Sequence, residues 1–516
     1  MKTRNLAGLA SVLGAVLLSG CLGLDIENPN NPDRERALDN SDDVETLAAS
    51  SWIAYWNRTQ VQGWPYYILT ANAGVHSTSV ANSGALLMSE LPRPIYDNNA
   101  VSEVSGLARW PWYNYYSDLD SANEALRALE AGMQFGPGGQ DTHRGRTFAT
   151  LSQGLLLGNI GLMHDQGFVA DETTPAEELG ALQPVPYPEV IEFAVGKLEA
   201  AAALAAQGSF EIPYIWMNNI VRNERELERF AHSQIARLLV YSARSPEERN
   251  QVDWNRVLQH LDRGIIQDVT ADHQSGDLGN SNFKRRISWD VFGGYRAWPG
   301  LIGKADVSSN YQDWLAMPLQ DRRRFQVTTP DRRITGATPD SDGKYYRYRT
   351  TNPFRDERGT WRQSYYQYYR WGGEWQNAEL TIMTVDEMNL LRAEAYLRTN
   401  RPQQAAELIN LTRVGNGELP PVTADGVPQT ADCVPRNDDG SCMDLMGALW
   451  WERMIEVTGM ESTRDWADQR GFGMLEEGTF LHLPIPGREL ETLGMPMYTF
   501  GGVGGEGAAP APTRPR

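Results

Sequence analysis

The chain has 516 residues, enough for up to three domains of ordinary size or for one large helical domain. Its content of 41% hydrophobic and 22% charged residues excludes wholesale disorder, collagen and an extended coiled coil. Lys and Arg total 47 against 66 Asp and Glu, and the resulting net charge of -19 repels phosphate backbones. Nucleic acid is therefore not an expected partner.

A secretory signal peptide is predicted at residues 1–20. Lys2 and Arg4 precede an apolar run at 6–18, and small residues follow the run up to Cys21. The run is shorter than the ~20 residues that a helix needs to cross a hydrocarbon core, so a permanent transmembrane anchor is not expected.

Cys21 closes the sequence Leu18-Ser19-Gly20-Cys21, which resembles the bacterial lipobox. In a lipobox the cysteine is acylated and becomes the mature N-terminus; the alternative is a stray cysteine beside an ordinary cleavage site. Buried acyl chains would hold the protein on a membrane without inserting the chain. We therefore predict lipidation at Cys21 and a lipid-anchored tether at 21–38, which begins with a stretch rich in Pro, Asn and Asp.

Amphipathic helices are predicted over most of the remaining chain. Asn40 and Ser41 offer N-caps for a first helix that runs to about Trp56. Similar periodicity is found at 113–131, 147–165, 188–207, 224–243, 254–266, 385–399, 402–414 and 445–458. The periodicity mostly fails between 267 and 381, so this section is predicted to be an irregular lobe that folds onto the helices as a binding surface.

The helical pair at 386–414 partly fits the 34-residue tetratricopeptide pattern. The matching positions are small, aromatic, turn, small and apolar in chain order: Ala393, Tyr396, Asn400, Ala405 and Ile409. The pair at 230–266 looks like the same unit with an insertion at 245–253.

Cys433 and Cys442 flank a loop rich in Pro, Asn, Asp and Gly. In an exported protein, an even pair at so short a spacing predicts a local disulfide. A metal site is the alternative, but no His lies within thirty residues on either side. Asp438, Asp439 and Asp444 lack EF-hand spacing, which favours a solvated acidic loop over a Ca²⁺ site.

Five segments in order resemble the SusD/RagB family of outer-membrane nutrient-binding lipoproteins. The first two are Asn28-Pro29-Asn30, similar to the family's Asn-Pro-rich start, and Trp112-Tyr113-Asn114-Tyr115-Tyr116 leading to Ala122-Asn123, similar to its aromatic-to-Ala-Asn helix. The third runs from Thr384 to Tyr396, continues at 405–410 and Arg413, and resembles the acidic-Leu-Arg-Ala-Glu-Ala-Tyr helix and its partner.

The last two segments lie near the C-terminus. Glu452-Arg453, Glu456, Gly459 and Arg464-Asp465-Trp466 resemble the family's Glu-Arg-x-x-Glu and Arg-Trp-x-Asp-Leu-Arg elements, with the order altered at Asp465 and Trp466. Leu483-Pro484-Ile485-Pro486 with Glu489 matches the closing Leu-Pro-Ile-Pro-x-x-Glu.

The resemblance implies a mainly α fold, a superhelix of tetratricopeptide-like helical pairs with a long irregular, loop-rich lobe. A single SusD-like domain would cover 39–500, with the lobe at about 267–381 and a flexible Gly/Pro tail at 501–516. Family members are not enzymes, and no cofactor or metal is expected. They sit as a lid on a SusC-like TonB-dependent transporter in the outer membrane and capture glycans or other polymers. Such a chain would be lipid-anchored and exposed on the cell surface.

Ligand-binding aromatic residues are expected in loops, because a sugar needs flat amphipathic rings for its C–H faces and polar groups for its hydroxyl rim. The candidates are Trp64, Tyr66 and Tyr67 after the first helix, and Tyr295 and Trp298 in the Gly-rich middle. Seven aromatic residues also crowd into 361–375. These are predicted mainly to pack the lobe, because consecutive tyrosines point to opposite faces of a strand.

Catalytic motifs are not found. The seven His, at 76, 143, 164, 232, 260, 273 and 482, show no i, i+4 pair, and the chain has no G-x-S-x-G elbow and no Walker A loop. The G-x-G-x-x-G match at 502–507 is followed only by an Ala/Pro-rich tail. Two alternatives to glycan capture remain at this point: the same fold with a peptide or another nutrient, and an anchored glycoside hydrolase.

Overall fold

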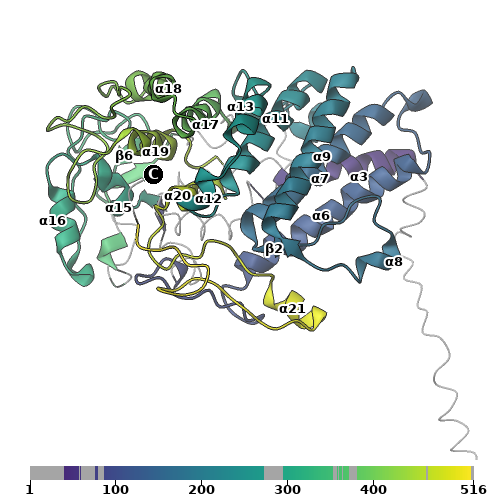
Figure 1. Ribbon diagram of the computed structural model, residues 1–516, viewed down its shortest axis with the longest axis horizontal. Helices are drawn as coiled ribbons and strands as arrows, with labels where there is room; N and C mark the ends of the chain where they lie inside the picture. The colour runs from purple at the N-terminus through teal and green to yellow at the C-terminus, as the bar shows by residue number, and fades with distance from the viewer. Residues whose placement is uncertain are drawn as a thin grey trace, which may run out of the picture.

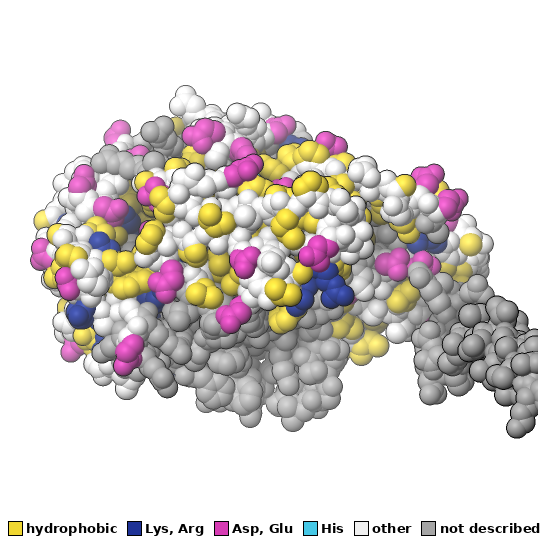
Figure 2. Space-filling view, turned by 90° about the horizontal axis from the view of Figure 1, so that it is seen from below, with side chains coloured by type: hydrophobic (Ala, Val, Ile, Leu, Met, Phe, Trp, Pro, Cys, Tyr) yellow, Lys and Arg dark blue, Asp and Glu magenta, His cyan; other side chains and the backbone are white. Residues whose placement is uncertain are grey.

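The computed structural model describes residues 40–56, 59, 76–78, 87–271, 295–351, 357, 359–362, 364–370, 380–460 and 463–512. An array of long helices forms one end of the molecule, and a lobe of short helices and strands forms the other (Figure 1). No helix in this described part is long and apolar enough to span a membrane. Seen from below, acidic side chains are spread over the described surface with apolar side chains between them (Figure 2).

The long helices pack against one another in chain order. They are α3 (Ser41–Trp56), α6 (Gly106–Glu130), α7 (Thr142–Met163), α9 (Tyr187–Gln207), α11 (Glu224–Tyr241), α13 (Trp254–Asp262), α17 (Val385–Arg398), α18 (Pro402–Gly415) and α19 (Leu445–Glu456). Each helix contacts the next, from α3 through α19. This succession of neighbouring antiparallel pairs confirms the mainly α, tetratricopeptide-like fold class.

Local sequence explains where many of these helices begin. The side chains of Asn223, Asp253, Thr384 and Asp444 each precede a helix and accept a hydrogen bond from a backbone N–H of its first turn. At the turn between α17 and α18, Asn400 adopts a left-handed φ of 58°, a conformation that asparagine tolerates well.

The predicted helix boundaries differ from the structure by four residues or more at three places. Helix α7 begins at Thr142 instead of residue 147. Helix α6 begins at Gly106 instead of residue 113. The predicted start is too late because Pro111, a residue type that ordinarily marks a helix end, lies inside this helix. Helix α13 ends at Asp262 instead of residue 266.

Several short helices lack the length for a visible apolar period, and the sequence did not predict them. They are α8 (Ala176–Leu179), α10 (Tyr214–Met217), α12 (Pro246–Asn250), α15 (Pro299–Ile302), α16 (Asn310–Ala316), α20 (Arg464–Phe472) and α21 (Gly487–Leu493). Single turns of 3₁₀-helix occur at η2 (Pro137–Gly139), η4 (Gly303–Ala305), η5 (Leu319–Asp321) and η7 (Thr360–Arg362).

Strands in the described residues form four two-stranded antiparallel ladders. These pair β1 (His76–Thr78) with β5 (Tyr295–Ala297), β2 (Gln166–Gly167) with β3 (Val185–Pro186), β4 (Val269–Ala271) with β8 (Leu380–Met383), and β6 (Tyr346–Tyr348) with β7 (Tyr366–Tyr368). The β4–β8 ladder closes the lobe at its two chain ends, because it joins the residues just after α13 to those just before α17.

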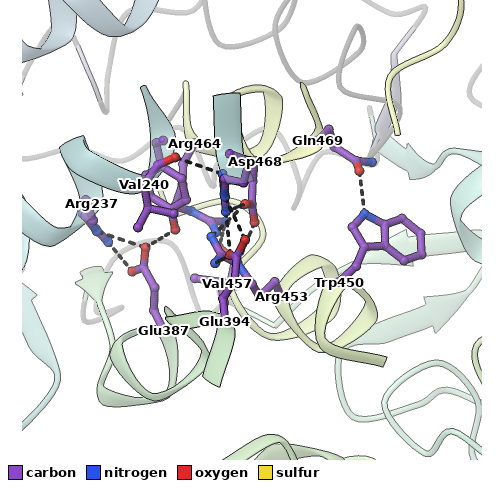
Figure 3. A network of polar contacts seen from close by, with 12 residues as sticks. Arg237, Val240, Glu387, Glu394, Trp450, Arg453, Val457, Arg464, Asp468 and Gln469 are labelled. Carbon is purple, nitrogen blue, oxygen red and sulfur yellow. Dashed lines mark hydrogen bonds and ion pairs between the residues drawn. The ribbon is translucent and has the colours of Figure 1, made fainter. Parts of the chain in front are cut away.

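A buried four-charge cluster joins α12, α17, α19 and α20 (Figure 3). Glu394 and Asp468 each accept hydrogen bonds from both Arg249 and Arg453, at N–O distances of 2.8–2.9 Å. All four side chains are at most 1% exposed. Each charge of the cluster has partners of opposite sign, as buried charges require, and Arg398 also contacts Glu394 at 3.3 Å.

A second buried cluster attaches the lobe to α19. Arg333, in the lobe, binds Glu452 and Glu456, with Nη1 at 2.5 and 2.9 Å from their carboxylates, and also binds Asp331. Glu452 and Glu456 are four residues apart and therefore share one face of α19. Arg453 lies about 100° around the helix from Glu452, so it reaches the first cluster instead.

Residues 501–512 do not form the flexible tail that their composition predicts. The backbone N–H of Gly502 donates to Gly478 O at 2.8 Å, and that of Leu481 donates to Gly507 O at 2.8 Å. Ala508 pairs with Phe480 in an antiparallel bridge. Gly501, Gly502, Gly504 and Gly507 all have positive φ, so these glycines form a compact turn. The predicted tail is thus wrong up to residue 512, and 513–516 lie outside the described residues.

We expect Glu394→Gln to lower the free energy of unfolding by about 3–5 kcal/mol, because it leaves two buried arginines with one carboxylate. Urea denaturation of the purified protein measures this. Glu226→Gln is the matched control, since Glu226 pairs with Arg222 on the surface of α11, where the loss should be below about 1 kcal/mol. Equal effects of the two substitutions would contradict the role of the buried cluster.

The stability should also fall at acid pH. Burial alone would raise the pKa of Glu394, but Arg249 and Arg453 outweigh burial and lower that pKa to about 2. A carboxylate with a lowered pKa stabilises the folded state above its unfolded value of about 4.5, and this contribution is lost as pH falls toward 2. Urea midpoints between pH 5 and about pH 2 should decline less steeply in Glu394→Gln than in the unmodified chain; parallel declines would contradict this assignment.

Candidate functional site

A cavity of about 210 Å³ lies where the lobe meets α19 and α20. Its walls come from segments far apart in the sequence: the lobe helices α15 and α16, the loop closed by Cys433 and Cys442, and the helices α19 and α20. The main lining side chains are Trp298, Tyr311, Trp314, Lys304, Arg322, Asp438, Trp450, Gln469 and Glu476.

The floor of the cavity is aromatic. Trp298 and Trp314 meet almost at right angles, with ring centroids 6.4 Å apart, and Tyr311 stacks beside Trp314 at 6.0 Å. Tyr311 and Trp314 are three residues apart in α16, so both rings project from the same side of the helix. On the opposite wall, Trp450 of α19 donates from Nε1 to Gln469 Oε1 of α20 at 2.7 Å (Figure 3).

Charged groups surround this floor. Lys304 Nζ lies 2.5 Å from Asp438 Oδ1, and the Tyr311 hydroxyl donates to the same oxygen at 3.0 Å. Burial raises the pKa of Tyr311 well above its usual value, and the Asp438 charge raises it further, so the hydroxyl remains a donor. The guanidinium of Arg322 lies over the Trp314 ring, 4.4 Å from its centroid.

A disulfide shapes the outer wall. Cys433 and Cys442 are bonded, with an S–S distance of 1.97 Å, and the loop between them carries Asp438. The backbone N–H of Arg436 in this loop donates to Lys304 O at 2.8 Å, which places Asp438 against Lys304. Asp439 Oδ1 accepts a hydrogen bond from the backbone N–H of Ser441, and Asp444 Oδ1 accepts one from the backbone N–H of Gly447 in the first turn of α19. Among the described residues, no three His, Cys, Asp or Glu are grouped so that they could hold a metal ion.

A larger cavity of about 500 Å³, between α9, α11 and α13, has a different character. Its lining includes no Trp, Tyr or Phe, and its Arg256 and Arg263 already pair with Glu192, Glu199 and Glu228. His232 and His260 face each other there, with Nδ1 atoms 2.9 Å apart, and burial lowers the pKa of His232 to about 4. This cavity lacks the flat rings that a sugar requires.

Of the comparisons with known proteins, the comparison with solved structures gives matches. No protein-family model and no curated protein matches the sequence. A SusD superfamily protein from Bacteroides vulgatus matches with a TM-score of 0.57 and 14% identity, over 88% of this chain and 97% of that chain. A SusD-like protein from Bacteroides fragilis matches with a TM-score of 0.52 and 12% identity, over 85% of this chain and 87% of that chain.

The chain has the SusD fold. A further SusD superfamily protein from Bacteroides fragilis matches at a TM-score of 0.50 and 12% identity and spans 88% of this chain and 97% of that chain. The matches therefore extend over most of the chain.

Of the two predicted ligand residues that the structure describes, Trp298 lines the cavity, where it is 8% exposed. Tyr295 lies in β5, where it pairs with Thr78 of β1. Trp64, Tyr66, Tyr67 and Cys21 lie outside the described residues.

The aromatic cluster at 361–375 packs the lobe, as predicted, wherever it is described. Trp361, Tyr366 and Tyr368 are buried, and the Tyr368 hydroxyl donates to Thr458 O at 2.8 Å. Trp361 lies edge-on to Trp298, with centroids 5.5 Å apart, so it supports the cavity floor from behind.

Sequence reasoning missed most of the cavity. Tyr311, Trp314, Lys304, Arg322 and Trp450 carried no recognisable motif. Asp438 is exposed, as the predicted solvated acidic loop requires, and it also lines the cavity. One available signal was the i, i+3 aromatic pair in α16, a segment too short to show a helical period.

Replacing both Cys433 and Cys442 by Ser should lower the free energy of unfolding by about 3 kcal/mol, because the unfolded chain gains the entropy of a loop of about ten residues. Urea denaturation of the double variant and of the unmodified protein, each with and without reductant, measures the difference. Reductant should destabilise only the unmodified protein. Equal stability of the double variant and the oxidised parent would contradict this prediction.

Proposed function

We propose that this protein is a surface nutrient-capture lipoprotein that binds a glycan and acts as the lid subunit of a SusC-like TonB-dependent outer-membrane transporter. The SusD fold supports a nutrient-binding role. The lipobox-like Leu18-Ser19-Gly20-Cys21 supports lipid anchoring, and the five family-like segments support the transporter partner and the outer-membrane location.

The observation that carries glycan binding is the composition of the 210 Å³ cavity. Trp298, Tyr311 and Trp314 offer flat rings to the C–H face of a sugar, and Lys304, Asp438 and Gln469 offer donors and acceptors to its hydroxyls. The cavity is smaller than the ~300–1,000 Å³ that encloses a drug-sized ligand, so it suits one unit of a longer chain.

A hydrolase is less well supported than a binding protein. The carboxylates that line the cavity are Asp438 and Glu476, and a glycosidase needs two carboxyl groups at a defined separation with distinct proton affinities. Asp438 is already held in an ion pair with Lys304 and a hydrogen bond from Tyr311. We therefore propose capture without turnover.

Isothermal titration of the full chain, purified in detergent, against a panel of plant, algal and bacterial polysaccharides and peptide digests tests the proposal. We expect saturable binding of one glycan class and no release of reducing ends over time. A response to peptides alone would instead assign the same fold to another nutrient, and a response to neither class would overturn the proposed function.

Trp314→Phe should weaken binding of the glycan identified in this panel about five-fold, since a smaller ring loses about 1 kcal/mol of stacking contact. Trp254→Phe is the matched control, because Trp254 is similarly buried but lies in α13, away from the cavity. Equal weakening in both variants would show that the effect arises from altered folding and not from the cavity.

A further inference from the structure

The lobe beside the cavity has a charge opposite to that of the whole chain. Residues 295–351 contain ten Lys and Arg against six Asp, a local net charge of +4, whereas the full chain has -19. Cations are therefore concentrated in the part of the lobe that supplies Trp298, Tyr311 and Trp314 to the cavity floor.

Several arginines of this region, among them the four considered next, have no carboxylate partner among the described residues. Within the part of the chain that the structure describes, no Asp or Glu oxygen lies within 4.0 Å of a guanidinium nitrogen of Arg322, Arg323, Arg324 or Arg347. Three buried arginines differ, since Arg249, Arg333 and Arg453 each bind at least two carboxylates. The buried Arg244, Arg413 and Arg470 donate to backbone carbonyls instead. Guanidinium groups keep their charge at any physiological pH, so the four positive charges persist.

Backbone carbonyls and aromatic rings hold these side chains in place. Arg322 donates from Nη2 to Leu315 O at 2.9 Å while its guanidinium lies over Trp314. Arg324 donates from Nη1 to Thr350 O at 3.1 Å and lies 4.6 Å from the Tyr365 ring centroid. Arg347 lies over Tyr369 at 3.1 Å. Each guanidinium is thus positioned while its charge is not neutralised.

These arginines continue directly from the cavity wall. Arg322 lines the cavity, and Arg324 is two residues further along, so their Cα atoms are within about 7 Å of each other. Arg324 in turn lies beside Thr350, next to the end of β6, the strand that carries Arg347. We call Arg322, Arg324 and Arg347 the arginine strip.

Further positively charged side chains lie beside the arginine strip. Burial, together with the charges of Arg349 and Arg324, lowers the pKa of the neighbouring Arg296 to about 10. One carboxylate, Asp342, partly offsets the group, at 3.2 Å from Arg349 Nη1. Such an arrangement is unfavourable for the protein by itself, and a bound anion would relieve the repulsion.

We propose that the arginine strip extends the cavity into a site for an acidic polysaccharide, with one sugar unit in the cavity and the carboxylate or sulfate groups of neighbouring units against the guanidinium groups. A planar guanidinium matches either oxyanion with two parallel N–H donors. This inference rests on the proposed function, because it names the substrate class of the same site.

The test uses the full chain in detergent and three probes: polygalacturonate, its fully methyl-esterified form, and a sulfated galactan. Polygalacturonate and its ester share a backbone and differ only in charge. We expect one acidic polymer to bind at least ten-fold more tightly than the ester, and to bind about ten-fold more weakly at 200 mM than at 50 mM NaCl. The two acidic probes distinguish carboxylate from sulfate as the recognised group.

The double variant Arg324→Gln, Arg347→Gln should lose about ten-fold in affinity for the acidic polymer and most of its salt dependence. Arg222→Gln is the control, since Arg222 is exposed on the far helical array and pairs with Glu226. Arg324→Lys keeps the positive charge but removes the planar guanidinium with its paired N–H donors. An intermediate loss of affinity in this variant would indicate bidentate contact.

The outcomes separate the inference about acidic polysaccharides from the proposed function on which it rests. If neutral glycans bind and neither acidic polymer is preferred over the ester, the inference is overturned and the proposed function stands. If no glycan binds, both the inference and the proposed function are overturned. If the double variant and Arg222→Gln weaken binding of the acidic polymer equally, the preference arises from general charge and the arginine strip is not the site.

Discussion

Helix α19 holds the molecule together because it carries charges of opposite sign on adjacent residues. Glu452 and Glu456 face Arg333 of the lobe, while Arg453 faces Glu394 and Asp468 of the helical array. Charges so deeply buried are tolerated only in pairs with good geometry, so few arrangements of lobe and array satisfy them all. The same helix contributes Trp450 to the cavity, which lies between the two parts that α19 joins.

This constraint explains why the inner and outer walls of the cavity are built differently. Gln469 follows Asp468 directly in α20, so a residue of the buried cluster fixes the position of a residue of the cavity. The outer wall comes from the short helix α16 and from the disulfide loop, whose Asp438 is placed by Lys304 and Tyr311. A rigid inner wall with a separately held outer wall is the usual way in which a scaffold presents a binding surface of variable sequence.

The sequence predicted the parts of the fold that repeat and missed those that depend on distant partners. Long amphipathic helices such as α9 and α11 show their period directly, and Ala393, Ala405 and Ile409 lie buried together between α17 and α18 as the repeat pattern requires. Arg333 and Glu452 are 119 residues apart, and no local pattern indicates that they meet. The glycines of 501–507 were assigned to a flexible tail because composition does not reveal that Gly478 and Leu481 hydrogen-bond to them.

The distribution of charge limits how an acidic polymer could be recognised. The net charge of -19 repels such a polymer during approach, but this repulsion is screened beyond about 8 Å at physiological ionic strength. Guanidinium contacts act at about 3 Å, well inside that distance. Recognition by the arginine strip would therefore depend on contact and not on long-range steering, so its strength should appear in slow release of the polymer more than in fast association. The acidic net charge of the chain as a whole also discourages polymers from binding elsewhere on the protein, which favours a single productive site next to the cavity.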